Sequence, residues 1–133
     1  MSDAENRRRH AFSGTLWEEQ VGYSRAIRAG DLIFITGTVA AHPDGSIISP
    51  GDPRAQSEAI FDKIQQALQE LDSTLEDIVR TRIFITDMAH AQAVGDVHAR
   101  VLGHVRPATT MVVVSELFGA GSVVEIEADA VRA

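Results

Sequence analysis

The sequence contains no cysteine, and this absence removes several kinds of chemistry. Without thiols the chain has no disulfide bonds, no thiolate metal ligands and no cysteine nucleophile. Long apolar runs are also missing. The two longest, residues 32–35 and 111–114, have four residues each, whereas a membrane-spanning helix needs about 20. Acidic and arginine residues interrupt the N-terminal region, which lacks the apolar stretch of a secretion signal. We therefore expect a cytoplasmic protein without a membrane partner.

Positive charge is scarce in this chain of 133 residues, whose length fits a single domain over residues 1–133. Twelve basic and nineteen acidic residues give a net charge of -7, so the overall field repels nucleic acid. The one basic cluster, Arg7 to Arg9, lies in a segment without apolar periodicity. A solvated tail is favoured there over a phosphate-binding arm, and we expect about residues 1–12 to be flexible.

The usual motifs for metal, nucleophilic serine and phosphate sites are absent. His90 and His98 lie eight residues apart, whereas a helical pair of metal ligands has a spacing of four. No serine lies in a Gly-x-Ser-x-Gly setting, and the glycines at 119 and 121 lack the length and the lysine of a phosphate loop. The sequence therefore predicts no metal site.

Hydrophobic periodicity predicts an α+β fold. Strands are expected at residues 23–28, 31–39, 78–86, 109–114 and 123–131, helices at 54–71 and 90–102, and a short strand or frayed edge at 46–48. Residues 32–35 are apolar on both faces of any strand, which is typical of a central strand covered on both sides. Two helices can cover only one face of a mixed sheet, so we expect self-association to cover the other.

Three acidic residues, Glu125, Glu127 and Asp129, alternate with apolar residues along the last predicted strand. The simplest interpretation is a solvated face, which we favour for Glu127 and Asp129. Glu125 follows two valines and could instead point into an oligomer interface, where its pKa would rise and it could act as a base. Arg25 and Arg106 each adjoin a predicted strand and are candidates for holding a carboxylate.

Five short motifs occur in a fixed order: Gly22-Tyr23-Ser24-Arg25, Phe34-Ile35-Thr36-Gly37, Leu75-Glu76-Asp77-Ile78-Val79-Arg80-Thr81, Arg106-Pro107-Ala108-Thr109-Thr110 and Val124-Glu125-Ile126-Glu127-Ala128. As a set they resemble the RidA/YjgF family, over about residues 21–131. The resemblance implies a chorismate-mutase-like α+β fold, with two helices on one face of a mixed sheet. It also implies a homotrimer whose sheets form a central barrel, with pockets at the subunit interfaces.

The resemblance also implies a site and an activity. Family members of the enamine/imine deaminase type hydrolyse 2-aminoacrylate and related imines to a keto acid and ammonia, without a metal or organic cofactor. By position, Tyr23 matches the aromatic pocket wall, Gly37 the glycine after the second strand, and Glu125 the glutamate that orients the attacking water. Thr109 stands where the deaminases carry a carboxylate-binding arginine, and Gly95 where they carry an asparagine.

We therefore expect a small-molecule hydrolase in which Glu125 activates water and Tyr23 and Thr109 shape the pocket. Arg106 or Arg25 would contact an anion, since Tyr23 and Arg25 share a strand face. The alternative is a non-catalytic trimer of the same family that binds a small acid or amide. A third possibility, an endoribonuclease or translation inhibitor, is disfavoured by the net negative charge.

Overall fold

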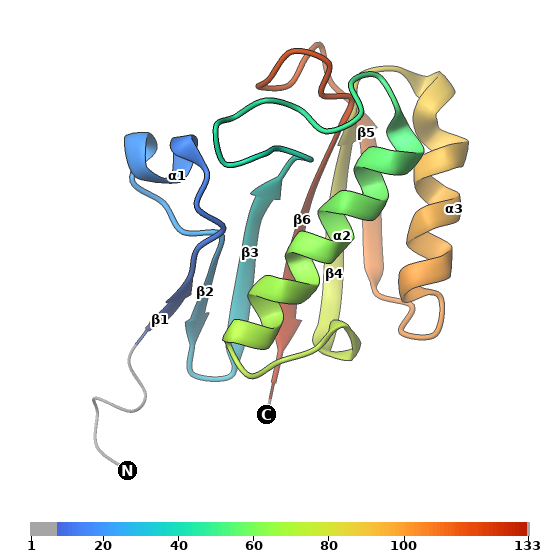
Figure 1. Cartoon of the computed structure of the whole chain (residues 1–133). Helices are drawn as coiled ribbons and strands as arrows, with labels where there is room; N and C mark the ends of the chain where they lie inside the picture. The colour runs from blue at the N-terminus through green and yellow to red at the C-terminus, as the bar shows by residue number, and fades with distance from the viewer. Residues whose placement is uncertain (1–7, 133) are drawn as a thin grey trace.

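The computed structural model describes residues 8–132, which form a six-stranded sheet and three helices (Figure 1). The strands follow the order β1-β2-β3-β6-β4-β5 across the sheet. Neighbouring strands are antiparallel except β4 and β5, which are parallel and joined through α3. The strands are β1 (Arg9–Ala11), β2 (Ala26–Ala29), β3 (Leu32–Thr38), β4 (Ile78–Ile85), β5 (Ala108–Val113) and β6 (Val124–Val131); the helices are α1 (Leu16–Val21), α2 (Pro53–Glu70) and α3 (Ala91–Leu102), with 3-10 turns at Leu75–Asp77 and Met88–His90. The predicted α+β class is confirmed.

Helix α2 begins where its sequence predicts. The side chain of Asp52 accepts a hydrogen bond of 3.0 Å from the backbone N–H of Ala55, and Pro53 occupies the first helical position. The apolar residues Ile60, Ile64 and Leu68 follow at helical spacing and are fully buried. They belong to one core with the inward residues of the central strands, which are Ile33, Ile35, Ile83, Ile85, Val124, Ile126 and Ala128. This packing fixes the positions of β3 and β6, which carry the candidate site.

Helices α2 and α3 lie over the same face of the sheet, and α1 lies apart from them on the β2 and β3 side (Figure 1). On the opposite face, Leu32 and Phe34 alternate with the buried residues of β3 and are 48% and 45% exposed. No helix among residues 8–132 covers them. The expected uncovered face is therefore present, and within residues 8–132 the helices cover only one side of the central strand.

The acidic residues of β6 lie on this open face. Val124, Ile126, Ala128 and Ala130 are buried beneath the helices, whereas Glu125, Glu127 and Asp129 are only partly buried. One nitrogen of Arg82, on the adjacent strand β4, lies 3.2 Å from Glu127 and 3.3 Å from Asp129. These two carboxylates are thus balanced by a half-exposed arginine, and Glu125 is the member of the row without an ion pair among the described residues.

The N-terminal segment is more ordered than the sequence predicted. Residues 9–11 form β1, which pairs with β2 in antiparallel register, and Ala11 is buried in the core. Arg9 also makes an ion pair of 2.8 Å with Asp72. A strand of three residues is too short for periodicity to reveal it, so the expected flexibility is wrong for residues 9–11. Residues 1–7, including Arg7, lie outside the described part of the chain.

Three further local differences lie near the cavity described below. The six-residue helix α1 was not predicted, because it is shorter than two turns and shows no clear apolar repeat. The strand expected at residues 23–28 begins only at Ala26. Of the two alternatives for residues 46–48, the short strand is absent, and an isolated bridge between Ala41 and Ile47 fits the frayed edge. Within residues 8–132, no helix is long and apolar enough to cross a membrane, and the cellular location stays a prediction.

Candidate functional site

A cavity of about 270 Å³ lies between α1, the ends of β3 and β6, and α2. It brings together four residues that the sequence singled out, namely Tyr23, Arg25, Gly37 and Glu125. The rest of its wall is mostly apolar and consists of Thr15, Trp17, Val21, Val39, Ala41, Lys63 and Phe118. A concave, largely apolar space with a few polar groups is typical of a small-molecule site.

Gly37 is required by the position of the Glu125 carboxylate. The pairing of β3 with β6 shifts register between Ile35 and Thr38, which brings the backbone of Gly37 against Glu125. A Cβ atom at position 37 would lie 2.5 Å from Oε2 of Glu125, closer than real contacts allow. Only glycine therefore leaves room for the carboxylate to occupy this part of the cavity.

The Glu125 carboxyl is set up to hold a proton more tightly than an ordinary glutamate. Burial is the main cause that raises its pKa; the positive charge of Arg25 opposes the shift, and Glu127 adds to it. A carboxyl group with a raised pKa is a better proton acceptor once it is ionised. Its location in a cavity makes Glu125 the strongest candidate for acid–base chemistry in this chain.

Arg25 mainly organises the wall of the cavity. Its side chain and that of Glu18 are both 4% exposed, and they form an ion pair of 3.1 Å. The same guanidinium donates to the backbone oxygen of Gly37 at 2.8 Å and to Thr38 Oγ1 at 3.1 Å, while Nε donates to Ser13 Oγ at 3.3 Å. Four of its five N–H donors are thus committed within the protein. Only one N–H donor of Arg25 therefore remains for the anion contact that the sequence predicted.

Glu18 has a strongly acidic carboxyl. Burial alone would raise its pKa, but hydrogen bonds from Ser13, Thr15 and Arg25 outweigh burial and lower the pKa to about 2. Thr15 Oγ1 donates to the carboxylate at 2.6 Å, and Ser13 contributes both its hydroxyl and its backbone N–H. The loop before α1, α1 itself and β3 are therefore held together through this one charged pair.

Thr109 and Arg106 do not reach this cavity within one chain. Thr109 lies on the outer strand β5, where its hydroxyl is 2.8 Å from Thr81 Oγ1 and 3.3 Å from His98 Nε2. Arg106 is exposed in the turn before β5 and has a positive φ of 56°. Gly95 lies in α3, where an added Cβ would meet nothing within 4 Å. A role for these three residues beside Glu125 would require a second copy of the chain.

Seven wall residues were not predicted as site residues, and the three largest of them are Trp17, Lys63 and Phe118. Trp17 belongs to the unpredicted helix α1, and Phe118 to the loop between β5 and β6. Lys63 lies three residues after Ile60 and four before Ala67, both of which are buried. This helical spacing places Lys63 at the edge of the packed face of α2 and was the signal available in the sequence.

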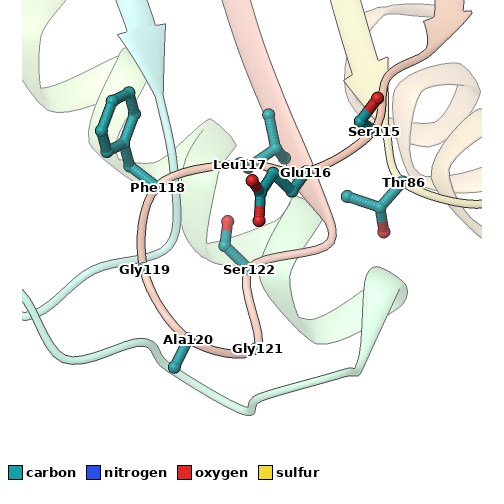
Figure 2. A pocket seen from close by; sticks show the side chains of 9 residues that line it. All are labelled: Thr86, Ser115, Glu116, Leu117, Phe118, Gly119, Ala120, Gly121 and Ser122. Atoms are coloured by element: carbon teal, nitrogen blue, oxygen red, sulfur yellow. The ribbon is translucent and has the colours of Figure 1, made fainter.

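A second hollow, of about 610 Å³, lies within the loop of residues 115–122. Figure 2 shows Glu116 and Ser122 inside the curve of this loop, whereas Phe118 points away from it. The Ser122 hydroxyl is buried and has no hydrogen-bond partner among the described residues. In residues 8–132 no three His, Asp or Glu side chains gather as a metal site. The 115–122 loop therefore contributes Phe118 to the first cavity and forms most of the wall of a second hollow.

Comparisons with known proteins agree with this geometry. The family model described as endoribonuclease L-PSP matches residues 17–132, and a solved structure from Mycobacterium tuberculosis, titled a member of the YjgF/YER057c/UK114 family, is 42% identical. The chain belongs to this family. The M. tuberculosis structure has a TM-score of 0.85, and the match covers 94% of this chain and 99% of that one. The expected RidA/YjgF membership and chorismate-mutase-like fold are thus confirmed.

Two further relatives show the same family at lower identity. An uncharacterized protein from Streptomyces coelicolor is 34% identical over 93% of this chain and 92% of its own length. A solved Rid-family protein of unknown function from Yersinia pestis is 28% identical, with a TM-score of 0.82 over 94% of this chain and 99% of that one. Both matches extend over more than nine-tenths of this chain and of the relative.

Replacement of Gly37 by alanine tests the packing of Glu125. The new Cβ would displace the carboxylate, which is the flexible end of its side chain, so Gly37→Ala should fold but release Glu125 toward solvent. We expect the pKa of Glu125 to fall toward its usual range in the variant, as measured by carbon-13 NMR of the side-chain carboxyl. Gly95→Ala is the control, because it should leave this titration unchanged and stabilise α3 by about 1 kcal/mol. Identical titrations in Gly37→Ala and the parent would contradict the packing.

Acid should selectively weaken the structure around Glu18. Because the folded-state pKa of about 2 lies below the ordinary value of 4.5, Glu18 contributes stability that is complete above pH 4.5 and is lost as the pH falls toward 2. The full contribution is about 3 kcal/mol. Denaturant unfolding of Glu18→Gln and parent should therefore differ most at neutral pH and converge in acid, whereas the exposed neighbour variant Glu19→Gln should match the parent throughout. A difference independent of pH would rule out the ion pair as its source.

Proposed function

We propose that this protein is a cofactor-independent hydrolase of a small imine or enamine, which releases ammonia in a pocket completed by a neighbouring subunit. The observation that carries the proposal is the partly buried Glu125 carboxyl, with its raised pKa, seated against Gly37 in a cavity. Family membership supports the same reading, because the positions of Tyr23, Gly37 and Glu125 match those expected in the deaminases.

The chemistry requires one acid–base group and a positioned water. Ionised Glu125 accepts a proton from water as the oxygen adds to the carbon of the protonated imine, which forms a carbinolamine. The same carboxyl then returns that proton to nitrogen. As the C–N bond breaks, the carboxylate takes the proton of the carbinolamine hydroxyl, which leaves a carbonyl compound and ammonia. Positioning and proton transfer each contribute to the rate, and an apolar wall keeps other water away from the reacting carbon.

The active assembly is proposed to be a homotrimer. Leu32 and Phe34 leave an apolar patch on the open sheet face, next to the acidic row of β6. Burial of such a patch against other copies stabilises an oligomer by about 25 cal/mol for each Å² removed from water. A neighbouring copy would also bring Thr109 and Arg106 within reach of a Glu125 site that one chain leaves incomplete.

A second candidate is a trimer that binds a small acid or amide without turnover. The observation that favours it is Thr109, a neutral hydroxyl at the position where an arginine is expected in the deaminases. An endoribonuclease is disfavoured despite the family description, because the chain carries a net charge of -7 and the cavity wall is mostly apolar. A ligand-dependent rise in melting temperature with no ammonia release would select the binding trimer.

Replacement of Glu125 by glutamine tests the proposed base. Glu125→Gln should lower the acceleration of ammonia release over the spontaneous rate by about a hundredfold or more, because the variant cannot accept a proton. The parent rate should fall as the pH drops through the raised pKa of Glu125, since only the ionised carboxylate acts as a base. The assay follows ammonia from a panel of imines generated in situ by an amino-acid oxidase.

Glu127→Gln is the matched control on the same strand, because Glu127 is paired with Arg82 and lies outside the cavity. It should retain the parent rate at high pH, and its acid limb should move only slightly to lower pH, because Glu127 makes the last-listed contribution to the raised pKa of Glu125. Equal rates in Glu125→Gln and the parent would remove Glu125 from the mechanism.

Sedimentation of the parent and of a variant altered on the open sheet face tests the proposed trimer. Sedimentation of the parent should give a particle of three times the chain mass of 14.4 kDa. Phe34→Glu should shift the protein to smaller species, because it places a charge opposite Asp129 in the apolar patch. Met88→Glu, at an exposed site in the turn before α3, is the control and should leave the assembly intact. A parent protein that sediments as a monomer would reject the proposed assembly.

A further inference from the structure

Lys63 is the only lysine in the sequence, and it lines the same cavity as Glu125. It projects from the middle of α2 and is half-buried. The described part of the chain provides no ion pair and no hydrogen bond for its ammonium group. An unpaired cation at a partly buried position is costly, and a ligand that supplies a counter-charge would remove that cost.

The neighbouring charges make Lys63 the cation available to a ligand. Arg25 is next to it in the cavity wall, but its charge is balanced by the buried carboxylate of Glu18. Burial lowers the pKa of Lys63, the positive charge of Arg25 lowers it further, and Glu18 partly offsets both. A bound anion would offset both the burial of Lys63 and its repulsion from Arg25, so the site favours a negatively charged group near Lys63.

We propose that Lys63 holds the anionic group of the ligand in this cavity, in place of the arginine that Thr109 replaces. This inference rests on the proposed function, in which the cavity takes a small imine, enamine or related acid. Thr109 on β5 does not reach this cavity, whereas Lys63 on α2 lines it together with Glu125 of the same chain. The anion would therefore be held from within one chain. The anion contact would then no longer depend on the neighbouring subunit.

The cavity also limits the size and character of the ligand. Its volume of about 270 Å³ restricts the ligand to a small molecule. Trp17, Val39 and Phe118 provide apolar surface for the body of such a molecule. The charge of Arg25 acts on both Lys63 and Glu125, so Arg25 lies near the anion contact and near the acid–base group. The ligand class is therefore a small carboxylic acid with an apolar body.

Benzoate and benzamide form a matched pair of probes for this contact, because they differ in charge but hardly in shape. Calorimetric titration of the parent should show that benzoate binds about tenfold or more tightly than benzamide. Lys63→Met should abolish this preference, and Lys63→Arg should keep it. Arg54→Met is the control, since it removes a positive charge from the exposed first turn of the same helix outside the cavity.

An undiminished preference for benzoate in a folded Lys63→Met variant would overturn the proposal, as would an equal loss in Arg54→Met. The ammonia assay separates this result from the proposed function. Lys63→Met with a normal benzoate preference, alongside an inactive Glu125→Gln, rejects the anchor alone. Loss of preference in Lys63→Met, with no turnover in the parent, supports the anchor and rejects the hydrolase.

A second measurement uses the unaltered sequence. Reductive carbon-13 methylation labels Lys63 and the N-terminal amine and preserves both positive charges. Benzoate should raise the pKa of the Lys63 resonance, whereas benzamide should not, and the N-terminal amine is the internal reference. A Lys63 titration unmoved by saturating benzoate would overturn the proposal even if Lys63→Met failed to fold.

Discussion

The charged pair of Arg25 and Glu18 is the interaction on which the candidate site depends. It joins the loop before α1 to the end of β3, because the same guanidinium also holds the backbone oxygen of Gly37 and the hydroxyl of Thr38. A buried charge without its partner costs several kcal/mol, so these segments are fixed relative to one another. The cavity exists between elements that this pair holds in place, and Gly37 then admits the Glu125 carboxylate.

The two faces of the sheet carry different groups of residues. Helices α2 and α3 cover one face and supply the core, while the open face presents an acidic row beside exposed apolar residues of β3. Glu127 and Asp129 are balanced by Arg82, which leaves Glu125 as the carboxyl whose proton affinity is raised by burial. A single chain therefore contains a carboxyl group with a raised pKa, a partly apolar cavity and exposed apolar residues on the open sheet face.

The charges around the cavity distinguish structural from ligand-directed roles. Arg25 is the obvious cation in the sequence motif, yet nearly all its donors are used inside the protein. Lys63 belongs to no motif, yet its ammonium group is the one in the cavity wall without a partner among the described residues. A cation that stabilises the wall and a cation that meets a ligand can therefore be told apart only by their hydrogen bonds.

The sequence by itself determined the α+β class, the helices near 54–71 and 90–102, the long strands and the uncovered sheet face. These features arise from local rules of hydrophobic spacing and capping, which act over a few residues. It also identified Tyr23, Gly37 and Glu125 as a group through family motifs. Only the tertiary structure decided that Arg25 is paired with Glu18, that β1 and α1 form, and that Lys63 meets the cavity. Those outcomes depend on contacts between segments far apart in the chain; helical spacing places Lys63 at the edge of the packed face of α2 but does not show what it faces.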